Sequence, residues 1–517
     1  MIWDLHAYLM ADLELVDAQD GVDMVRCEAY KHPDNPLAGG ELGEDPRTIQ
    51  TPGTLRGRPV CVARDGGVYR GWFAHGHRSG LLQYGESDDG VHFKPRHVGT
   101  TAVGGSTKNN VVTVNDDPAL SVCGMMYDPL DSEYRYKTVV MRRGGREDLH
   151  PGVAAKFPRL WEGWAHHPSI GWFVGGIGRS RDGFAWEMPP ADQTLIDEII
   201  EGPVVHRAID GGYVIGNQMV TQASDIGFRK VKGWVTYDGR RAWRIPDYVF
   251  KLPDHMTLVF SRWLGATSQE AFPWVQSHVL LIPMRKGASM FALHGYLYGA
   301  PRIDRYACTY DVGLAVSATG YGFRQVWPFR PFLRRGNMGE WDCTSVRQAG
   351  SIVETDDRTL FYYAGGQGGN ARTDPRYYKS GWGVASVEKD RLGFFAIWQN
   401  VDYRKMARRG LLTLRPIRLP DRPAIAVNAA NCTRRRTLRL ALRSPAGKAI
   451  PGFGFDDCVP VTRDGLRRVV RWRDRGVADL AGKEVTIAVE FHSPDCQYPD
   501  LHSPRLYAVY TAAGRPR

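Results

Sequence analysis

Four acidic residues at or just before the starts of candidate β-strands have the types and spacing to do acid/base chemistry. They are Asp117 in Asp-Asp-Pro, Glu201 in Glu-Gly-Pro, and Glu340 and Asp342 in Glu-Trp-Asp. Two carboxyl groups can divide such work when their pKa values differ. The group with the raised pKa donates a proton to a leaving oxygen, and the ionised group attacks carbon or activates water. These four are the candidate catalytic residues.

Each acid also has a plain structural interpretation. Asp117 could start a turn before a proline, and Glu340 and Asp342 could belong to a turn that closes the ring. Glu201 ends an acidic run that begins at Asp197, and such runs are usually solvated loops. The candidate substrate-binding residues near these positions are His278, Asn110, Arg58 and Trp341.

Motifs for metals and nucleotides are weak in this chain. His75 and His77 form a His-x-His pair, which on a strand is more often hydrogen-bonded structure than a metal site. The eight cysteines include no Cys-x-x-Cys pair, so neither a zinc cage nor a dense disulfide framework is expected. The glycine runs at 175–178 and 365–369 lack the Gly-Lys-Ser/Thr ending of a phosphate loop. We expect no metal and no cofactor.

A recurring turn motif indicates which elements position these residues. It consists of Ser or Thr, a Gly three residues later and an aromatic residue soon after. Clear copies stand at 87–93, 180–186 and 317–323, and looser ones at 236–243 and 385–394. Because Gly accepts the positive φ of tight turns, each copy predicts a turn between two strands.

A second pattern precedes every copy: an extended segment, a polar turn and an aromatic strand. It starts near Cys61, Met125, Val204, Val279 and Ile352. Each unit thus supplies two hairpins, and five such units predict a five-bladed β-propeller. A sandwich made of similar hairpins is the structural alternative. In a propeller, the first strand of each blade starts at one mouth of the central channel, which would bring the candidate acids together.

The net charge of +11 belongs to the last part of the 517-residue chain. Residues 404–517 hold 23 Lys and Arg against 10 Asp and Glu, whereas the first 403 residues hold 44 against 46. This C-terminal arginine-rich surface is either a solvated sheet face or a surface for a polyanion.

A change in the residue pattern in the C-terminal part of the chain also indicates the domain organisation. Polar and apolar residues alternate over 436–442 and 485–491, which predicts a C-terminal β-sandwich. We therefore expect an all-β chain. A propeller domain with an N-terminal extension would occupy 1–405 and a sandwich 406–517, with the proline-rich stretch 413–427 as the crossing.

The five-unit pattern, with acids at successive strand starts and a C-terminal sandwich, resembles the five-bladed glycoside hydrolases. It is most similar to the invertase and fructosidase group (glycoside hydrolase family thirty-two) and its relatives acting on arabinofuranosides and xylosides. Asp117-Pro118 matches the Asp-Pro that opens the second blade of that group and binds sugar hydroxyls. Glu201-Gly202-Pro203 matches the Glu-Cys-Pro of the third blade, with Gly in place of Cys. The resemblance covers roughly residues 50–395.

One motif of the group has no match. Its first blade opens with Asn-Asp-Pro-Asn, whose Asp is the nucleophile or base, whereas this chain has Arg58-Pro59 near that position. Either Asp45 reaches in, or Asp342 or Glu340 has taken the task, or the site no longer hydrolyses.

The resemblance implies a cofactor-free glycoside hydrolase or transglycosylase, acting on a furanoside such as a fructoside or arabinofuranoside. Glu201 would be the general acid, Asp342 the partner carboxylate and Asp117 the stabiliser of the oxocarbenium-like state. Two alternatives stay open. One is a non-catalytic carbohydrate-binding propeller. The other is a phosphate-dependent glycoside phosphorylase, in which Arg58 or Arg347 would bind phosphate.

The N-terminus shows no basic segment followed by a long apolar core, so no secretory signal is expected. No stretch approaches the roughly 20 apolar residues of a membrane span. We expect a cytoplasmic enzyme with a carbohydrate substrate and with no nucleic-acid or membrane partner. Whether it forms a homo-oligomer is left open.

Overall fold

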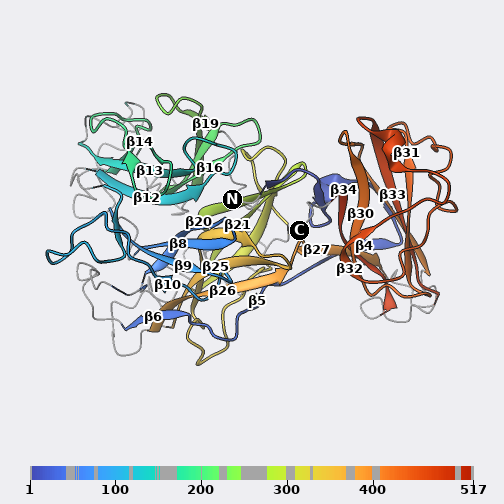
Figure 1. Ribbon diagram of the computed structural model, residues 1–517, viewed down its shortest axis with the longest axis horizontal. Helices are drawn as coiled ribbons and strands as arrows, with labels where there is room; N and C mark the ends of the chain where they lie inside the picture. Colours follow the sequence, from blue (N-terminus) through green and yellow to red (C-terminus); the bar gives the residue numbers. More distant parts are fainter. Residues whose placement is uncertain are drawn as a thin grey trace, which may run out of the picture.

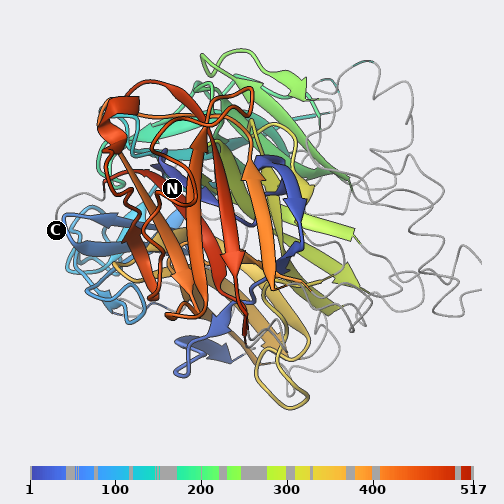
Figure 2. The same cartoon turned by 90° about the vertical axis from the view of Figure 1, so that its right-hand side faces the viewer.

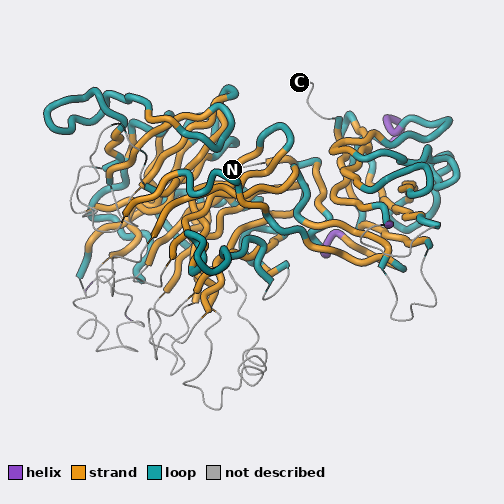
Figure 3. Tube along the Cα trace, turned by 90° about the horizontal axis from the view of Figure 1, so that it is seen from below, coloured by secondary structure: helices purple, strands orange, loops and turns teal. Residues whose placement is uncertain are grey.

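The structure is a computed structural model that describes residues 3–41, 53, 55, 57–74, 80–115, 120–145, 147, 151, 172–198, 201–219, 230–245, 276–298, 309–326, 330–367, 379–398, 408–494 and 502–513. The prediction of an all-β chain is confirmed, since strands dominate and helix is limited to short segments such as η1 (Leu13–Leu15) and η6 (Val477–Leu480) (Figure 3). Within these residues, no helix combines the length and apolar character needed to cross a membrane.

Five antiparallel units follow one another along the chain, and a parallel pair between Tyr310 and Ser345 joins the last two units into one sheet (Figure 1). Unit one contains β7 (Arg58–Asp65), β8 (Val68–Ala74), β9 (Leu81–Ser87), β10 (Lys94–Pro95) and β11 (Val111–Thr113). Unit two contains β12 (Leu120–Tyr127), β13 (Tyr136–Arg143), β14 (Trp172–Ser180) and β15 (Trp186–Glu187). Unit three contains β16 (Glu201–Arg207), β17 (Tyr213–Met219), β18 (Lys230–Thr236) and β19 (Trp243–Ile245). Unit four contains β20 (Gln276–Lys286), β21 (Ser289–Tyr298), β22 (Thr309–Ser317) and β23 (Arg324–Gln325). Unit five contains β24 (Ser345–Glu354), β25 (Arg358–Gln367) and β26 (Lys379–Glu388).

The recurring turn motif forms the same hydrogen-bonded turn between the third and fourth strands of units one to four. In each copy, the N–H of a glycine donates to the hydroxyl three residues earlier at 2.8–2.9 Å. The glycines are Gly90, Gly183, Gly239 and Gly320, with φ between 71° and 86°. These φ values favour glycine, so the motif is a local structural signal. The copy predicted at 385–394 differs, because the chain there leaves unit five through Asp390 and enters another sheet.

The first strands of the five units contact one another in a closed cycle, from β7 through β12, β16, β20 and β24 back to β7. The C-terminal ends of these first strands lie close to one another. Arg207 at the end of β16 lies 2.9 Å from the carboxylate of Asp128, which follows β12. Lys286 Nζ, at the end of β20, lies 2.5 Å from Glu354 Oε1, at the end of β24. Arg64, near the end of β7, donates a hydrogen bond to the Glu354 carbonyl. The five strands thus run in one direction, and their starts meet at the opposite end of the ring.

The N-terminal segment completes unit five. β5 (Tyr30–Lys31) and β6 (Ala38–Glu41) both pair with β26 and provide the outer strand that unit five does not draw from its own stretch of chain. β1 (Trp3–Asp4) runs parallel to the end of β20. Unit five therefore takes its outer strand from the stretch of chain just ahead of unit one, which links the last unit of the ring to the first.

The remaining strands form a second body, two sheets that pack face to face around one apolar core (Figures 1 and 2). One sheet contains β32 (Gly465–Val469), β30 (Pro423–Ala430), β34 (Arg505–Ala512), β27 (Gly393–Ile397), β4 (Val22–Arg26) and β2 (Ala7–Leu9). The other contains β29 (Ile417–Arg418), β33 (Glu484–His492), β28 (Arg409–Leu414), β3 (Val16–Asp20) and β31 (Thr437–Arg443).

This body draws on both ends of the chain. Strands β2, β3 and β4 come from the predicted N-terminal extension, and the chain enters the body at β27, ahead of the predicted crossing at 413–427. Residues 413–427 instead form strands inside it. A division at residue 405 therefore does not describe the pairing of the sheets, because main-chain hydrogen bonds join residues 7–26 to the C-terminal strands.

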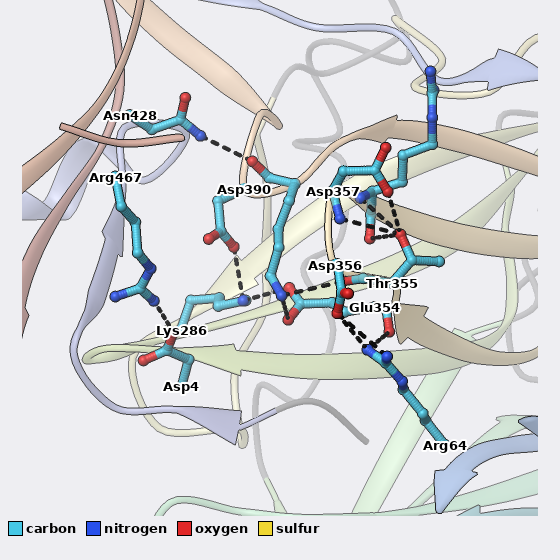
Figure 4. Close-up of polar contacts among 12 residues, drawn as sticks. Asp4, Arg64, Lys286, Glu354, Thr355, Asp356, Asp357, Asp390, Asn428 and Arg467 are labelled. Atoms are coloured by element: carbon cyan, nitrogen blue, oxygen red, sulfur yellow. Dashed lines mark hydrogen bonds and ion pairs between the residues drawn. The ribbon is translucent and has the colours of Figure 1, made fainter. Parts of the chain in front are cut away.

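A buried charge cluster joins units four and five to the two-sheet body (Figure 4). Lys286 Nζ is fully buried and lies 2.5 Å from Glu354 Oε1 and 2.7 Å from Asp390 Oδ1. The hydroxyl of Tyr510, on β34, donates to Asp390 Oδ2 at 2.8 Å. Burial acts to lower the pKa of Lys286, but the two carboxylates raise it above its usual range. Burial acts to raise the pKa of Asp390, but the Lys286 charge holds it below its usual value. Lys286 and Asp390 are therefore ionised at neutral pH.

We predict that Lys286→Met lowers the free energy of unfolding by about 3–5 kcal/mol at pH 7, because two carboxylates lose their buried cation. The difference in the free energy of unfolding between the wild type and this variant should become smaller below about pH 4. The wild type loses the contribution of Asp390 as the pH falls through a folded pKa that lies below the unfolded value of about 3.9. Lys286, whose pKa is raised, stays charged throughout this range. Thermal and urea unfolding at pH 7 and below pH 4 measure both effects.

Arg64→Met is the matched control. Arg64 Nη1 lies 3.3 Å from Asp356 Oδ1, and both side chains are exposed. An exposed pair of this kind contributes less than about 1 kcal/mol. Equal losses in the two variants would contradict a special role for the buried cluster.

Candidate active site

The starts of the five first strands lie at one end of the ring, and several predicted site residues belong to them. Arg58 begins β7, Glu201 begins β16 and His278 is the third residue of β20. Asp342 precedes the start of β24 by three residues. The described residues do not include Asp117, Asp45, His75 or His77.

Every first strand breaks its regular pairing near its start. The shifts fall between residues 59 and 61, 123 and 125, 201 and 204, 278 and 282, and 348 and 352. Such bulges bend a strand and re-aim its side chains, and they are common beside active sites. Three of them contain glycines with positive φ, namely Gly124, Gly202 and Gly350. A Cβ on Gly124 would lie 2.9 Å from the carbonyl oxygen of Pro203, and one on Gly350 would lie 2.8 Å from that of Pro59. Neighbouring units therefore approach closely at the level of Glu201.

Asp342 is buried and has a cation partner. Lys31 Nζ, on β5, lies 2.6 Å from Asp342 Oδ2, and the Asp342 side chain is 2% exposed. Tyr363, on β25, lies beside this pair, and its pKa is raised by burial and by the Asp342 charge. The carboxylate thus interacts with the outer strands of unit five and holds the N-terminal segment.

Trp341 packs on the same unit. Its ring stacks on Tyr363, with ring centroids 5.7 Å apart and an interplanar angle of 23°. Gly365 leaves room for this packing, because a Cβ there would lie 2.6 Å from the Trp341 ring and 2.7 Å from the Cβ of Asp342. The structure therefore gives Trp341 a packing role, whereas the sequence suggested substrate binding.

Glu340 lies in an exposed turn. Its carboxylate accepts the backbone N–H of Asn337 at 2.8 Å and the side-chain Nδ2–H of Asn337 at 3.1 Å. These hydrogen bonds lower the pKa of Glu340. The carboxylate thus stabilises the turn, and its role as the nucleophile or base stays a prediction.

Asn110 lies away from the first strands. It precedes β11, which pairs with β9, the third strand of unit one. The buried side chain accepts the N–H of Gly53 at 3.0 Å and donates to the carbonyl of Tyr84 at 3.2 Å. Both ends of the amide are thus bonded to main chain, which does not support the predicted role in substrate binding.

The contacts of Arg347, the third residue of β24, favour its predicted role as an anion-binding residue. Its guanidinium carbon lies 4.0 Å from the centroid of the Tyr310 ring, near the start of β22. The Nε of Arg347 is buried and has no hydrogen-bond partner in the part of the chain that the structure describes. A cation of this kind at the strand starts suits an anionic group of a ligand. Sequence reasoning missed Tyr310 and Lys31, which stand in no motif and reach their partners from distant segments.

Comparisons with known proteins complete this description. No protein-family model matches the chain, and no curated protein matches it significantly. A glycoside hydrolase family 43 arabinoxylan arabinofuranohydrolase from Bacillus subtilis is 10% identical over 94% of this chain and 99% of its own, with a TM-score of 0.36. The GH43B protein of a Bacteroides ovatus xyloglucan locus is 9% identical over 94% and 100%, with a TM-score of 0.37.

A third solved structure belongs to work on the GH130 family of mannoside phosphorylases, which contains glycoside hydrolases that target β-1,2 mannosidic linkages in Candida mannan. It is 16% identical over 70% of this chain and 94% of its own, with a TM-score of 0.39. Because all three TM-scores lie below 0.5, these likenesses do not establish the activity of this chain.

We predict that Gly365→Ala displaces Trp341 and Asp342 and lowers the free energy of unfolding by about 1–3 kcal/mol, because the new methyl group has no room. Gly476→Ala is the matched control, since a Cβ there meets nothing within 4 Å and the φ of Gly476 is −97°. The melting temperatures of the two variants measure the difference. Two equal melting temperatures would show that Gly365 is not needed for this packing.

Proposed function

We propose that the five antiparallel units are the blades of a five-bladed β-propeller and that the two-sheet body is a C-terminal β-sandwich. The closed cycle of contacts among the first strands supports the propeller, because such strands line the central channel of that fold. The common core of the two sheets supports the sandwich. The site of chemistry is then the mouth where the first strands start.

We further propose that the chain cleaves or transfers a glycosidic bond of a furanoside such as a fructoside or arabinofuranoside. The observation that carries this proposal is the position of Glu201. It is the first residue of β16, at the strand-start end of the ring, within a register shift that contains Gly202 and Pro203. This is the position at which the general acid stands in the glycosidases that the sequence resembles.

We propose Asp117 rather than Asp342 as the partner carboxylate. Both stand three residues ahead of a first strand, β12 and β24 respectively. The ion pair with Lys31 engages Asp342, whereas Asp117 matches the Asp-Pro of the glycosidases that the sequence resembles. In the reaction, Glu201 gives its proton to the leaving oxygen as the bond to the anomeric carbon breaks, and the ionised partner stabilises the positive charge that develops there.

We predict that Glu201→Gln lowers kcat on aryl furanosides and on fructan or arabinan oligosaccharides by about 10²–10⁴-fold, the usual contribution of a general acid. The loss should be smallest for aryl groups that leave easily, because they need least help from a proton. The basic limb of the pH–rate profile should also disappear. Initial rates across a series of aryl glycosides measure these effects.

Asp197→Asn is the matched control, because Asp197 is an exposed acid of the same sequence run. It should keep the wild-type rate. A folded Glu201→Gln variant with undiminished turnover would remove Glu201 from the mechanism. A wild type that binds sugars but never cleaves them, with or without phosphate, would support the carbohydrate-binding alternative instead.

A second candidate function, phosphorolysis, is favoured by Arg347. Its buried Nε has no acceptor among the described residues, and its guanidinium lies over Tyr310 near two strand starts. In this reaction an oxygen of inorganic phosphate attacks the anomeric carbon, the glycosidic C–O bond breaks and Glu201 protonates the leaving oxygen. The arginine would hold the attacking phosphate.

We predict for this case that phosphate raises turnover in a saturable manner and that the product is a glycosyl phosphate. Arg347→Gln should raise the KM for phosphate at least about tenfold, as expected when a charge-assisted hydrogen bond worth about 1.5–3 kcal/mol is lost. Phosphorus NMR of the products and initial rates at varied phosphate concentration measure this. Turnover that is independent of phosphate leaves hydrolysis as the function.

A further inference from the structure

Two histidines and an aspartate meet at the seam between unit five and unit one. His32 and Asp34 follow β5, and His92 lies in the turn between β9 and β10. One potential ligand atom from each of the three lies within 4.8 Å of the other two. The rings of His32 and His92 are 5.5 Å apart between centroids, at an interplanar angle of 80°. Imidazole and carboxylate from separate segments are thus brought to one point.

The N-terminal side of this cluster is fixed to unit five. The N–H of His32 donates to the carbonyl of Val384, on β26, at 2.8 Å. The Asn35 side chain forms two hydrogen bonds with Val384. Its Nδ2 donates to the Val384 carbonyl at 2.9 Å, and its Oδ1 accepts the Val384 N–H at 3.0 Å. His32 and Asp34 therefore stand on a segment that cannot move away without breaking its pairing to the sheet.

The other side is fixed by Asp89. Its Oδ1 accepts the backbone N–H groups of Val91 and His92, each at 2.8 Å, and the hydroxyl of Ser87 at 2.7 Å. Its Oδ2 lies 2.7 Å from Nδ1 of His92. A carboxylate in this position would hold the proton on Nδ1 when Nε2 gives up its own proton to coordinate a metal ion, as the outer carboxylates of metal-bound histidines do. Nε2 of His92 in turn points at Asp34 Oδ2, 3.0 Å away.

We propose that His32, Asp34 and His92 form a binding site for a divalent transition-metal ion, with zinc the best fit, which closes the ring between unit five and unit one. Two imidazoles and one carboxylate suit zinc, whereas calcium and magnesium prefer oxygen ligands alone. The three side chains are 32–59% exposed, so water can fill the remaining coordination positions. The carboxylates of Asp34 and Asp89 offset the charge of the ion.

The ligands come from two segments that meet at the seam. Residues 32–34 belong to the segment that gives unit five its outer strand, whereas residue 92 belongs to the first unit. Zinc bound to both would add a direct link across the seam, beside the hydrogen bond that Tyr362 donates to the carbonyl of Gly90 at 2.6 Å. The site does not depend on the proposed enzymatic activity, because it lies at the turn end of unit one and not at the strand starts.

The test is zinc binding by the full chain without a polyhistidine tag, after treatment with a chelator. We expect one zinc ion per chain in a competition titration against a chromophoric chelator, and a higher melting temperature with zinc. The double variant His32→Gln, His92→Gln should lose at least about 100-fold in affinity and show no thermal shift. The control His492→Gln, which removes an exposed histidine of the two-sheet body, should behave as the wild type.

Cobalt substitution gives a second measurement that does not depend on stability. Cobalt at the site should produce visible absorption bands in the wild type and not in His92→Gln, and Asp89→Asn should weaken zinc binding without abolishing it. If the wild type binds no stoichiometric zinc at micromolar concentrations, or if the double variant binds it equally well, the proposal is wrong.

Discussion

Closure of the ring by the N-terminal segment is the constraint on which the rest of the structure depends. Units one to four take their fourth strand from the chain that follows their own turn, whereas unit five ends at β26. Without β5 and β6, the N–H and C=O groups along β26 would form an open edge, which favours pairing with other chains. The segment that covers this edge continues into β2, β3 and β4 of the two-sheet body in the N-terminal direction. One stretch of about forty residues therefore ties the ring to itself and to the second body.

The two ends of the ring consequently have different characters. At the end where the first strands finish, the glycine turns and the cluster around Lys286 are formed by short-range or buried contacts. At the end where they start, each strand carries a register shift. Rigid scaffolds commonly present functional residues on loops and strand ends in this way. The buried cluster fixes the position of units four and five, so the strand starts that they contribute are fixed as well.

Much of the fold could be predicted from sequence because its signals are local. The hydroxyl-to-glycine turns involve residues three apart, and Glu201 stands directly at a strand start. The contacts that change the interpretation of the site are not local. Lys31 and Asp342 lie far apart in the sequence, and Asn110 is bonded to the main chain of Gly53 and Tyr84. No spacing or periodicity reports such contacts, and the same holds for the pairing of residues 7–26 with the C-terminal strands.

The structural role of Asp342 follows from the way in which the N-terminal segment completes unit five. Asp117 and Asp342 stand at equivalent positions in the sequence, because each lies three residues ahead of the first strand of its unit. Only unit five receives its outer strand from the N-terminal segment, and that strand carries Lys31. The buried carboxylate of Asp342 needs a cation within reach, because an unpaired buried charge is costly. The unit that closes the ring thus uses its acid in this position for a structural ion pair.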